Sequence, residues 1–457
     1  MFGFEKSLEG KKVFIETLGC AKNTVDSEKV AFLLTNKGAK LVDTPEEADI
    51  VMVNTCGFIE DAKQESIDYI LSYAKLKEDL RKKKGINQKL VVFGCLSERY
   101  KEELLKEIPE IDIMSGVRDY IYLVNSLSAN GNNQKLIDTS GEYRDIIFSE
   151  GEVRRWINKD YPYAYLKISE GCNHTCSFCA IPIIRGKQRS RSIESLVEEV
   201  KFLVDNGVKE VILVSQDTSS YGIDNYGKPR LADLMYEISK VEGLEWIRLH
   251  YLYPTEVDDS IISAIAGIDK VCKYIDIPFQ HASDRILKMM KRGGNKKQYI
   301  DLIEKIRNRI ADVAIRTTFI VGFPGETKED FLELKKFVEE VKFTWVGVFT
   351  YSHEENTSAF SLEDNVPKSV KTRRRNEILR LQYDITQKEL RKLVGKVKKV
   401  IIDEVLSDRD YIARSEFNSP EVDGAIHLVS TTRLNKGDIV ESFIVKVVGY
   451  DLYARKV

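Results

Sequence analysis

One stretch of the sequence joins a short strand to a loop of closely spaced cysteines: AYLKISEGCNHTCSFC, residues 164–179. Its first part, AYLKIS (164–169), is rich in the apolar and β-forming residues of a buried strand. The loop then places Cys172, Cys176 and Cys179 close together in a chain of 457 residues that holds only seven cysteines. Thiolates are soft ligands that suit zinc or an iron–sulfur cluster. The loop after this strand is therefore the first candidate metal site.

The same strand opens a longer alternation of strands and helices. The further candidate strands are EVILVS (210–215), WIRLH (246–250), YIDIPF (274–279), IRTTFIVG (315–322) and WVGVFTYS (345–352). Helical segments separate most of them, and in the clearest one Ser192 caps the start and Gly207 ends it. Six units without a seventh and eighth predict a partial (β/α)6 version of the TIM barrel. Active sites of such barrels lie at the carboxyl ends of the strands, where the cysteine loop begins.

The amino-terminal part predicts a separate parallel α/β domain. Its strands are KKVFIET (11–17), ADIVMVNT (48–55) and KLVVFG (89–94), with helical segments between them, one of them from about Asp26 to Asn36. Cys20, Cys56 and Cys95 each lie at or just beyond the carboxyl end of one of these strands. Because parallel strands end at the same edge of a sheet, we expect the three cysteines to share that edge. Buried, inert cysteines are the alternative, since free cysteine is commonly buried.

The carboxyl-terminal part predicts a small β domain after a long helix. The helix is KTRRRNEILRLQYDITQKELRKL (371–393), and five short β-rich segments follow it. Short strands at this spacing indicate a small antiparallel barrel. The predicted domains are residues 11–127, 158–388 and 392–457, with a polar connector from about Asn125 to Asp160.

Charge and composition limit the classes of partner. Lys and Arg number 70 against 72 Asp and Glu, and residues 392–457 hold 11 against 10. A dedicated RNA-binding module is usually more basic. No run of about 18 apolar residues occurs, so we expect a soluble cytoplasmic protein that binds no membrane. A reducing cytoplasm keeps cysteines as thiols that are available to a metal.

The three cysteines of the loop could belong to a structural zinc site or to an electron-transfer cluster, and their spacing also resembles a known motif. A structural zinc site needs four ligands, and His174 is the candidate fourth. Bacterial ferredoxins use a different run of cysteines, which disfavours simple electron transfer. Cys172, Cys176 and Cys179, with Phe178 before the last cysteine, resemble the radical S-adenosylmethionine signature. The resemblance implies that the three cysteines hold a 4Fe-4S cluster whose fourth iron binds S-adenosylmethionine.

Two further segments fit the same resemblance. GFPGET (322–327) is similar to the glycine-rich segment that lies along the adenosyl group in this superfamily. VSQDTSSYG (214–222) ends the second barrel strand and puts polar side chains on the same rim. The candidate cofactor-binding residues are Gln216, Asp217, Gly322, Pro324, Gly325 and Glu326.

The whole chain resembles the methylthiotransferases, which combine a cysteine-bearing amino-terminal domain, a radical barrel and a terminal β domain of the TRAM type. ETLGCAKNTVDSE (16–28), VNTCGF (53–58) and VFGCLSERY (92–100) correspond to the loops that bind a second 4Fe-4S cluster in that family. The resemblance implies that Cys20, Cys56 and Cys95 are its ligands. It also implies two S-adenosylmethionine molecules per product, a low-potential electron donor and a sulfur donor.

Members of this family modify either an adenosine of tRNA or an aspartate of ribosomal protein S-twelve. GFIEDAKQES (57–66), the loop through Arg191 and LHYLYP (249–254) resemble the ribosomal-protein branch. β-Methylthiolation of that aspartate is the leading prediction. The alternatives are a tRNA adenosine 2-methylthiotransferase, for which tRNA would be the partner, and a non-catalytic iron–sulfur or zinc-binding RNA module.

Other residues carry weaker predictions. His174 has no obvious acidic partner in the sequence, so we expect it to face solvent or to support the loop. His281 is balanced between packing and function, and Cys272 is expected to be a core thiol. The runs RKKK (81–84) and RRR (373–375) are typical of solvated helix faces.

Three arginines follow the cysteine loop. Arg185, Arg189 and Arg191 are candidates to meet an anionic substrate or the cofactor carboxylate, because guanidinium groups suit carboxylates.

Overall fold

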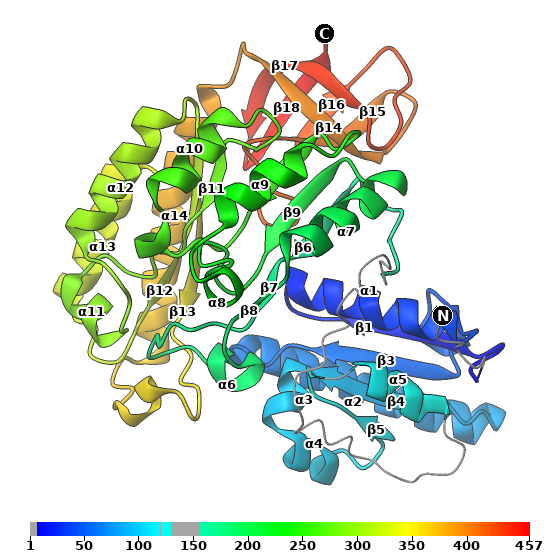
Figure 1. Ribbon diagram of the computed structural model, residues 1–457. Helices are drawn as coiled ribbons and strands as arrows, with labels where there is room; N and C mark the ends of the chain where they lie inside the picture. Colours follow the sequence, from blue (N-terminus) through cyan, green and yellow to red (C-terminus); the bar gives the residue numbers. More distant parts are fainter. Residues whose placement is uncertain (1–6, 119, 129–154) are drawn as a thin grey trace. The chain divides into compact units, whose positions relative to one another are not determined.

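The structure is a computed structural model that describes residues 7–118, 120–128 and 155–457. The chain forms two compact units (Figure 1). The first unit holds the described residues up to Asn158 together with 171–173 and 179–187. The second holds residues 159–170, 174–178 and 188–457. Most of the predicted polar connector, residues 129–154, lies outside the described residues.

The first unit is built on a parallel sheet with helices on both faces. Its described strands follow the order β2-β1-β3-β4-β5. They are β1 (Lys12–Thr17), β2 (Lys40–Leu41), β3 (Ile50–Thr55), β4 (Lys89–Gly94) and β5 (Ile113–Met114). The described helices are α1 (Ala21–Asn36), the 3-10 turn η1 (Pro45–Glu47), α2 (Glu60–Lys84), α3 (Cys95–Arg99), α4 (Lys101–Glu107), α5 (Tyr120–Ser128) and α6 (Ile181–Arg185).

Strand β3 shows why this sheet is covered on both sides. All six of its residues are buried, and successive side chains point to opposite faces. Ile50 and Met52 pack in a cluster with apolar residues of α1 and α5. Val51 and Val53 pack in another cluster with residues of α2. The parallel α/β prediction is confirmed, and α1 begins at Ala21, five residues before the predicted start.

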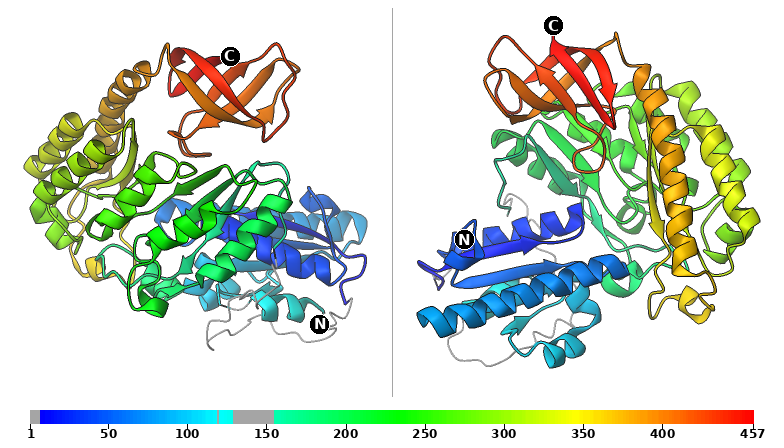
Figure 2. Two further views of the ribbon diagram at one scale, coloured as in Figure 1. Left: turned by 45° about the horizontal axis from the view of Figure 1, so that its top comes forward. Right: turned by 180° about the vertical axis from the view of Figure 1, so that it is seen from behind.

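The second unit contains six parallel strands and the helices between them (Figures 1 and 2). The strands are β6 (Tyr163–Lys167), β9 (Glu210–Val214), β10 (Trp246–Leu249), β11 (Tyr274–Asp276), β12 (Ala314–Val321) and β13 (Trp345–Thr350). A parallel bridge between Ile247 and Val271 joins the β10-β9-β6 group to the β11-β12-β13 group. Within the fully described stretch 155–457 this is the predicted partial barrel.

Helices alternate with these strands. They are α7 (Ile193–Asp205), α8 (Ile223–Tyr226), α9 (Leu231–Ser239), η2 (Pro254–Glu256), α10 (Asp259–Gly267), α11 (Asp284–Met289), α12 (Lys296–Arg309), α13 (Lys328–Val341), η3 (Ser358–Ser361) and α14 (Lys368–Arg391). A short antiparallel pair, β7 (Ser169–Glu170) and β8 (Arg189–Ser190), flanks the cysteine loop in sequence. The predicted cap of α7 is present, since the Ser192 side chain accepts a hydrogen bond from the Ser195 N–H. No described helix is both long and apolar enough to cross a bilayer.

The chain ends in a closed five-stranded barrel of the order β14-β15-β16-β18-β17. Its strands are β14 (Val397–Val405), β15 (Asp410–Ser415), β16 (Ile426–Val429), β17 (Ile439–Val448) and β18 (Asp451–Lys456). Four strand pairs are antiparallel, as predicted, and β16 pairs with β18 in parallel. Its core merges with Trp246, Tyr274 and Trp345, which begin β10, β11 and β13. The small barrel therefore packs on the amino ends of the parallel strands and leaves their carboxyl ends to the site.

Candidate active site

The three upstream cysteines come together in the first unit. Cys20 immediately precedes α1, Cys56 follows β3, and Cys95 begins α3 directly after β4. Burial raises the pKa of the Cys56 thiol to about 12, and the neighbouring Cys95 and Cys20 add to that rise. Groups that influence one another's charge in this way lie near each other. The predicted gathering of these cysteines at one sheet edge is confirmed.

Asn23 holds the loops around these cysteines and was missed from the sequence. Its side-chain NH2 group donates to the Leu18 carbonyl at 2.7 Å and to the Thr55 carbonyl at 3.2 Å, next to Cys56. The Cys95 Sγ lies 3.9 Å from the Asn23 Oδ1. The feature of the sequence that could have identified Asn23 is its position three residues after Cys20, which puts it in the first turn of α1.

Arg185 also belongs to this group, although it follows the downstream cysteine loop in sequence. It is the last residue of α6, and its side chain is buried. Its guanidinium donates to Asp26 Oδ2 at 3.0 Å, to Asn23 Oδ1 at 2.9 Å and to Cys95 Sγ at 3.2 Å. The carboxylate that Arg185 meets in this structure is that of Asp26, and its contact with a substrate or cofactor carboxylate stays a prediction.

The downstream loop is shared between the two units. Cys172 and Cys179 belong to the first unit and Cys176 to the second. In the first unit, the Cys172 N–H donates to the Gly186 carbonyl at 3.1 Å, and a side chain at Gly171 would lie 2.2 Å from the Lys187 carbonyl oxygen. Glycine at position 171 is therefore required for the loop to close on this segment.

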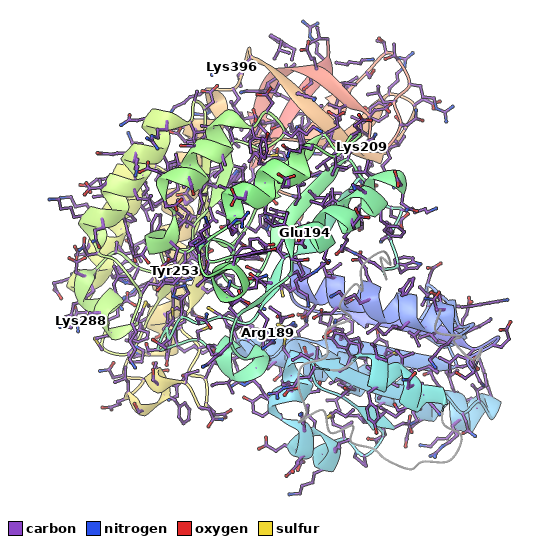
Figure 3. The ribbon with its side chains drawn as sticks, viewed as in Figure 1. Arg189, Glu194, Lys209, Tyr253, Lys288 and Lys396 are labelled. Carbon is purple, nitrogen blue, oxygen red and sulfur yellow. The ribbon has the colours of Figure 1, made fainter. Side chains whose placement is uncertain are left out.

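In the second unit, Cys176 lies beside an aromatic and cationic group that the sequence did not single out. Arg292 contacts the Cys176 Sγ at 3.7 Å and lies over the ring of Tyr253, 3.9 Å from its centre. His174 stacks on the same ring in parallel, with ring centres 3.5 Å apart (Tyr253 is labelled in Figure 3). Tyr253 lies in the LHYLYP segment, just after β10. An aromatic residue near the carboxyl end of a strand was therefore the feature of the sequence that could have identified it.

His174 has an acidic partner that the sequence did not reveal, and the contact is compatible with the expected supporting role of this residue in the loop. Its Nε2 lies 2.6 Å from Asp217 Oδ2. Burial by itself raises the pKa of Asp217, but hydrogen bonds from His174, Ser219 and Ser220 outweigh it and hold the pKa below its usual value. His174 and Asp217 are 43 positions apart in the sequence. They pair because the loops after β6 and β9 meet at the same rim.

Gln216, the neighbour of Asp217, is linked to a buried ion pair. Its side-chain nitrogen donates to Glu170 Oε1 at 2.6 Å, and Glu170 Oε2 accepts from Lys167 at 2.6 Å. The Gln216 Oε1 is buried and accepts no hydrogen bond from the residues that the structure describes. This oxygen lies at the carboxyl end of β9.

The GFPGET segment forms a rigid loop between β12 and α13. Gly322 has φ +76° and packs against the Lys371 side chain, which a Cβ would approach to 2.3 Å. Glu326 folds back on its own loop, accepting from the N–H groups of Gly322 and Phe323. The Gly325 N–H donates to Asn365 Oδ1 at 2.8 Å, and Pro324 is buried.

Arg374 completes this loop and corrects the prediction for RRR (373–375). It is 7% exposed, lies 3.2 Å from Glu326 Oε1 and donates to the carbonyls of Glu326 and Thr327 at 3.1 Å each. This arginine therefore points into the unit, whereas the residues of RKKK (81–84) are exposed as predicted. His281 is fully buried, accepts from the Ser283 N–H and lies 3.9 Å from Glu326.

The remaining candidate residues, Cys272, Arg191 and Arg189, lie in a core, beside a helix and in a strand, respectively. Cys272 is buried in the core shared with the small barrel, as predicted. Arg191 binds Glu199 and Ser195 of α7 rather than facing an open site. Arg189 lies half-buried in β8.

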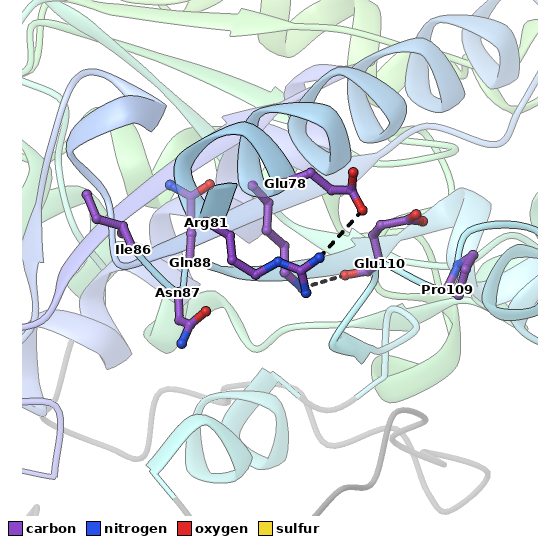
Figure 4. Close-up of a pocket in the computed structure, with 8 residues that line it drawn as sticks. Glu78, Arg81, Ile86, Asn87, Gln88, Pro109 and Glu110 are labelled. Atoms are coloured by element: carbon purple, nitrogen blue, oxygen red, sulfur yellow. Dashed lines mark hydrogen bonds and ion pairs between the residues drawn. The ribbon is translucent and has the colours of Figure 1, made fainter. Parts of the chain in front are cut away.

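One polar surface pocket in the first unit lies away from the cysteines (Figure 4). It is lined by Lys77, Glu78, Arg81, Ile86, Asn87, Gln88, Pro109 and Glu110. Gln88 precedes β4, whereas Cys95 follows it, so the pocket lies at the opposite edge of the sheet.

None of the seven cysteines forms a disulfide bond in the structure. In the described ranges, no group of three or more His, Cys, Asp or Glu side chains is arranged to hold a single metal ion. A four-iron cluster puts iron and sulfide between its thiolates and so needs a wider cage than one ion does. The three thiols of the first unit, of which Cys56 and Cys95 are buried and Cys20 is partly buried, fit the soft donor set that such a cluster uses, and a guanidinium lies on the Cys95 sulfur.

Comparison with known proteins places the chain. Residues 166–338 match the radical SAM superfamily, residues 12–116 match the uncharacterized protein family UPF0004, and residues 394–457 match the TRAM domain. A ribosomal protein uS12 methylthiotransferase RimO from Aquifex aeolicus is 47% identical, over 97% of each chain. The RimO proteins of Clostridioides difficile and Thermoanaerobacter sp. are 43% and 44% identical, over 96% and 97% of this chain and 98% and 99% of theirs.

The chain belongs to the RimO family. It is a radical S-adenosylmethionine enzyme of the transferase class.

Solved structures support the fold of this family member. A radical S-adenosylmethionine methyltransferase, TsrM from Kitasatospora setae, superposes with a TM-score of 0.53 at 16% identity, over 74% of this chain and 75% of that one. The cobalamin-dependent S-adenosylmethionine radical enzyme OxsB gives a TM-score of 0.51 at 13% identity, over 83% of this chain and 57% of that one.

Proposed function

We propose that this protein β-methylthiolates an aspartate of ribosomal protein uS12. The observation that carries the proposal is the gathering of Cys20, Cys56 and Cys95 at one sheet edge of a chain that also has the 172–179 cysteine loop. Two triads of thiols match a reaction that needs both a radical and a delivered sulfur. The uS12 substrate is supported by near-full-length relatives that carry this activity in their names.

Each triad is proposed to hold one 4Fe-4S cluster, with Cys20, Cys56 and Cys95 as one set of ligands and Cys172, Cys176 and Cys179 as the other. When bound, the cluster on Cys172, Cys176 and Cys179 would supply the electron that cleaves S-adenosylmethionine, and the cluster on Cys20, Cys56 and Cys95 would supply the position from which methylated sulfur is delivered. Three ligands per four-iron cluster leave one iron free in each, for S-adenosylmethionine in one case and sulfur in the other. The reaction also requires a low-potential electron donor and a sulfur donor.

The side chains at the barrel rim are proposed to bind S-adenosylmethionine. Gln216 supports this role with a buried oxygen that accepts no hydrogen bond from the described residues. Asp217 holds His174 against Tyr253 and so orders the cysteine loop beside Cys176. Gly322, Pro324 and Gly325 offer a rigid backbone surface, while Glu326 shapes that surface by binding its own loop.

The proposed domains are residues 11–127, 158–388 and 392–457, and the proposed location is the cytoplasm. A reducing compartment would keep the proposed ligand cysteines as thiols that are available to iron. A near-neutral terminal domain supports a basic protein substrate over tRNA, because tRNA binding relies on positive charge.

The test is mass spectrometry of products after anaerobic reconstitution with iron, sulfide, S-adenosylmethionine and dithionite. We expect uS12 to gain a methylthio group in place of one hydrogen at a single aspartate. A uS12 variant with asparagine at that position is the matched control and should stay unmodified. Methylthiolation of tRNA adenosine without any mass gain on uS12 would contradict the proposal and favour the tRNA enzyme.

A further inference from the structure

The segment that carries the downstream cysteines also contributes to the upstream cysteine site. After Cys179 the chain forms α6, and Ala180, which precedes this helix, and Ile184 within it are fully buried in a cluster with Cys95 and Val117. Arg185 then ends α6 and reaches the Cys95 sulfur at 3.2 Å. All of these residues belong to the first unit. One stretch of chain thus bears Cys172, Cys176 and Cys179 and, six residues later, a cation on a thiol of the other triad.

The guanidinium of Arg185 is held in one orientation. One nitrogen donates to Asp26, which is fully buried, and another donates to both Asn23 and Cys95. Asn23 is itself fixed, since its amide nitrogen binds the Leu18 and Thr55 carbonyls beside the other two cysteines. A planar guanidinium can make these divergent contacts at once, whereas the single ammonium of lysine is a point charge on a flexible stem.

This contact opposes the cost of burying a thiolate. A guanidinium nitrogen of Arg185 donates to the buried Cys95 sulfur at 3.2 Å, and a positive charge at that distance favours a thiolate over a thiol. Thiolate is the form that binds iron. Hydrogen bonds to the sulfurs and nearby charge are among the factors that set the potential of an iron–sulfur cluster.

We propose that Arg185 is a positioning residue that orients the Cys95 thiolate and raises the reduction potential of the cluster on Cys20, Cys56 and Cys95. The inference rests on the proposed function, because it requires that cluster. A fixed positive charge at the sulfur favours the reduced cluster, which carries one more negative charge.

The test measures the potential of one cluster at a time in the full-length chain. Replacing Cys172, Cys176 and Cys179 by alanine leaves only the upstream cluster. In this background we expect Arg185→Gln to retain iron and sulfide but to lower the midpoint potential, measured by redox titration with electron paramagnetic resonance. A tenfold fall in the ratio of reduced to oxidised cluster at fixed poise corresponds to about 59 mV for one electron. Arg185→Lys keeps the charge without the geometry and should give a smaller shift.

Arg292 is the matched control, because it contacts the Cys176 sulfur of the other triad at 3.7 Å. Arg292→Gln should leave the potential of the upstream cluster unchanged. With Cys20, Cys56 and Cys95 replaced by alanine instead, it should lower the potential of the downstream cluster.

The outcomes separate this inference from the proposed function. A wild-type potential with full iron in Arg185→Gln would overturn the inference and leave the proposed function intact. Loss of the cluster in Arg185→Gln at an unchanged melting temperature of the apo chain supports the positioning role, and Arg185→Lys then reports the potential. A lowered apo melting temperature in both variants would also overturn it, since Arg185 would then be a structural residue. A parent chain that binds zinc or no cluster at all contradicts the proposed function itself.

Discussion

At the scale of single residues, the upstream site depends on side chains and backbone positions that lie around its cysteines. Asn23 binds the Leu18 and Thr55 carbonyls, and Arg185 donates to the Cys95 sulfur. Gly19 has φ +98°, and a Cβ there would lie 2.6 Å from the Cys56 Cβ and 2.9 Å from its sulfur. The Cys20 loop can therefore lie against Cys56 only because residue 19 has no side chain.

Replacing Gly19 by alanine should remove iron from the upstream site. The added methyl group collides with the Cys56 side chain and must displace either that thiol or the Cys20 loop. In the chain without the downstream cysteines, we expect at least a severalfold loss of iron and sulfide per chain, measured by colorimetric analysis. Gly10→Ala is the control, because Gly10 also has positive φ, at +74°, but nothing within 4 Å of a built Cβ. Full iron in Gly19→Ala, equal to that in Gly10→Ala, would show that contact with Cys56 does not limit the site.

At the scale of elements, the ends of strands and helices place the functional groups. Cys56, Cys95 and Asp217 all follow the carboxyl end of a parallel strand. Helices α7 and α13 begin with side-chain caps, Ser192 and Thr327, and α13 has a full capping box with Asp330. Because α13 starts where GFPGET ends, its cap also fixes the end of that loop.

Replacing Ser192 by alanine should loosen the first turn of α7. An N-cap hydroxyl contributes about 1 kcal/mol, which corresponds to about a fivefold faster local opening. Hydrogen exchange followed by mass spectrometry should show faster exchange in a peptide that contains the Ser195 N–H. Ser239→Ala is the control. The Ser239 hydroxyl belongs to the last residue of α9 and donates to the Tyr236 carbonyl in an exposed hydrogen bond, so its removal should leave the exchange of the Ser195 peptide unchanged. Unaltered exchange in Ser192→Ala would show that packing alone holds the turn.

At the scale of the whole molecule, the terminal TRAM barrel is joined to the radical barrel by a buried charge network within the second unit. Glu210, at the start of β9, binds Arg248 at 2.6 Å and Arg414 of β15 at 2.8 Å. Arg414 also binds Asp403 of β14 at 2.5 Å. Arg248 donates to the carbonyls of Ser415 and Glu416. These contacts are fully or nearly fully buried, so the TRAM barrel is part of this unit and not a tethered appendage.

Replacing Glu210 by glutamine should destabilise this junction. The neutral amide would remove the negative charge that balances the buried guanidinium groups of Arg248 and Arg414. Breaking a buried ion pair costs about 3–5 kcal/mol. We expect a lower melting temperature in differential scanning calorimetry and faster proteolytic release of residues 392–457. The control is Glu245→Gln, because Glu245 pairs with Lys399 of β14 across the same junction but is exposed to solvent. An exposed pair contributes about 0–1 kcal/mol. Similar behaviour of the two variants would show that apolar packing carries the junction.

The six barrel strands and the three longer strands of the first unit were predictable from local pattern. Each has a run of apolar, β-forming residues between turn signals, and the observed bounds lie within a few residues of the predicted ones. The strands β2 and β5 were not predicted, because two residues carry no periodicity. The shared edge of the upstream cysteines was predictable because parallel topology converts strand ends into neighbours.

The sequence pattern could not predict which polar side chains pair with each other. Arg374 lies in a run of three arginines that resembles a solvated face, yet it binds Glu326 in the loop after β12. His174 lacks an acidic neighbour in sequence and finds Asp217 only because two strand ends meet. Both cases concern polar groups, whose surroundings depend on a partner from a distant segment.

The sequence alone determined which segments form strands and helices, which residues are thiols and which family the pattern resembles, because these are properties of local spacing and residue type. The tertiary structure alone decided which charge meets which. It put Arg185 on Cys95, Arg292 on Cys176 and Glu210 between two arginines. A charged side chain is stable in the interior only beside a partner, and the fold, not the neighbouring sequence, brings that partner near.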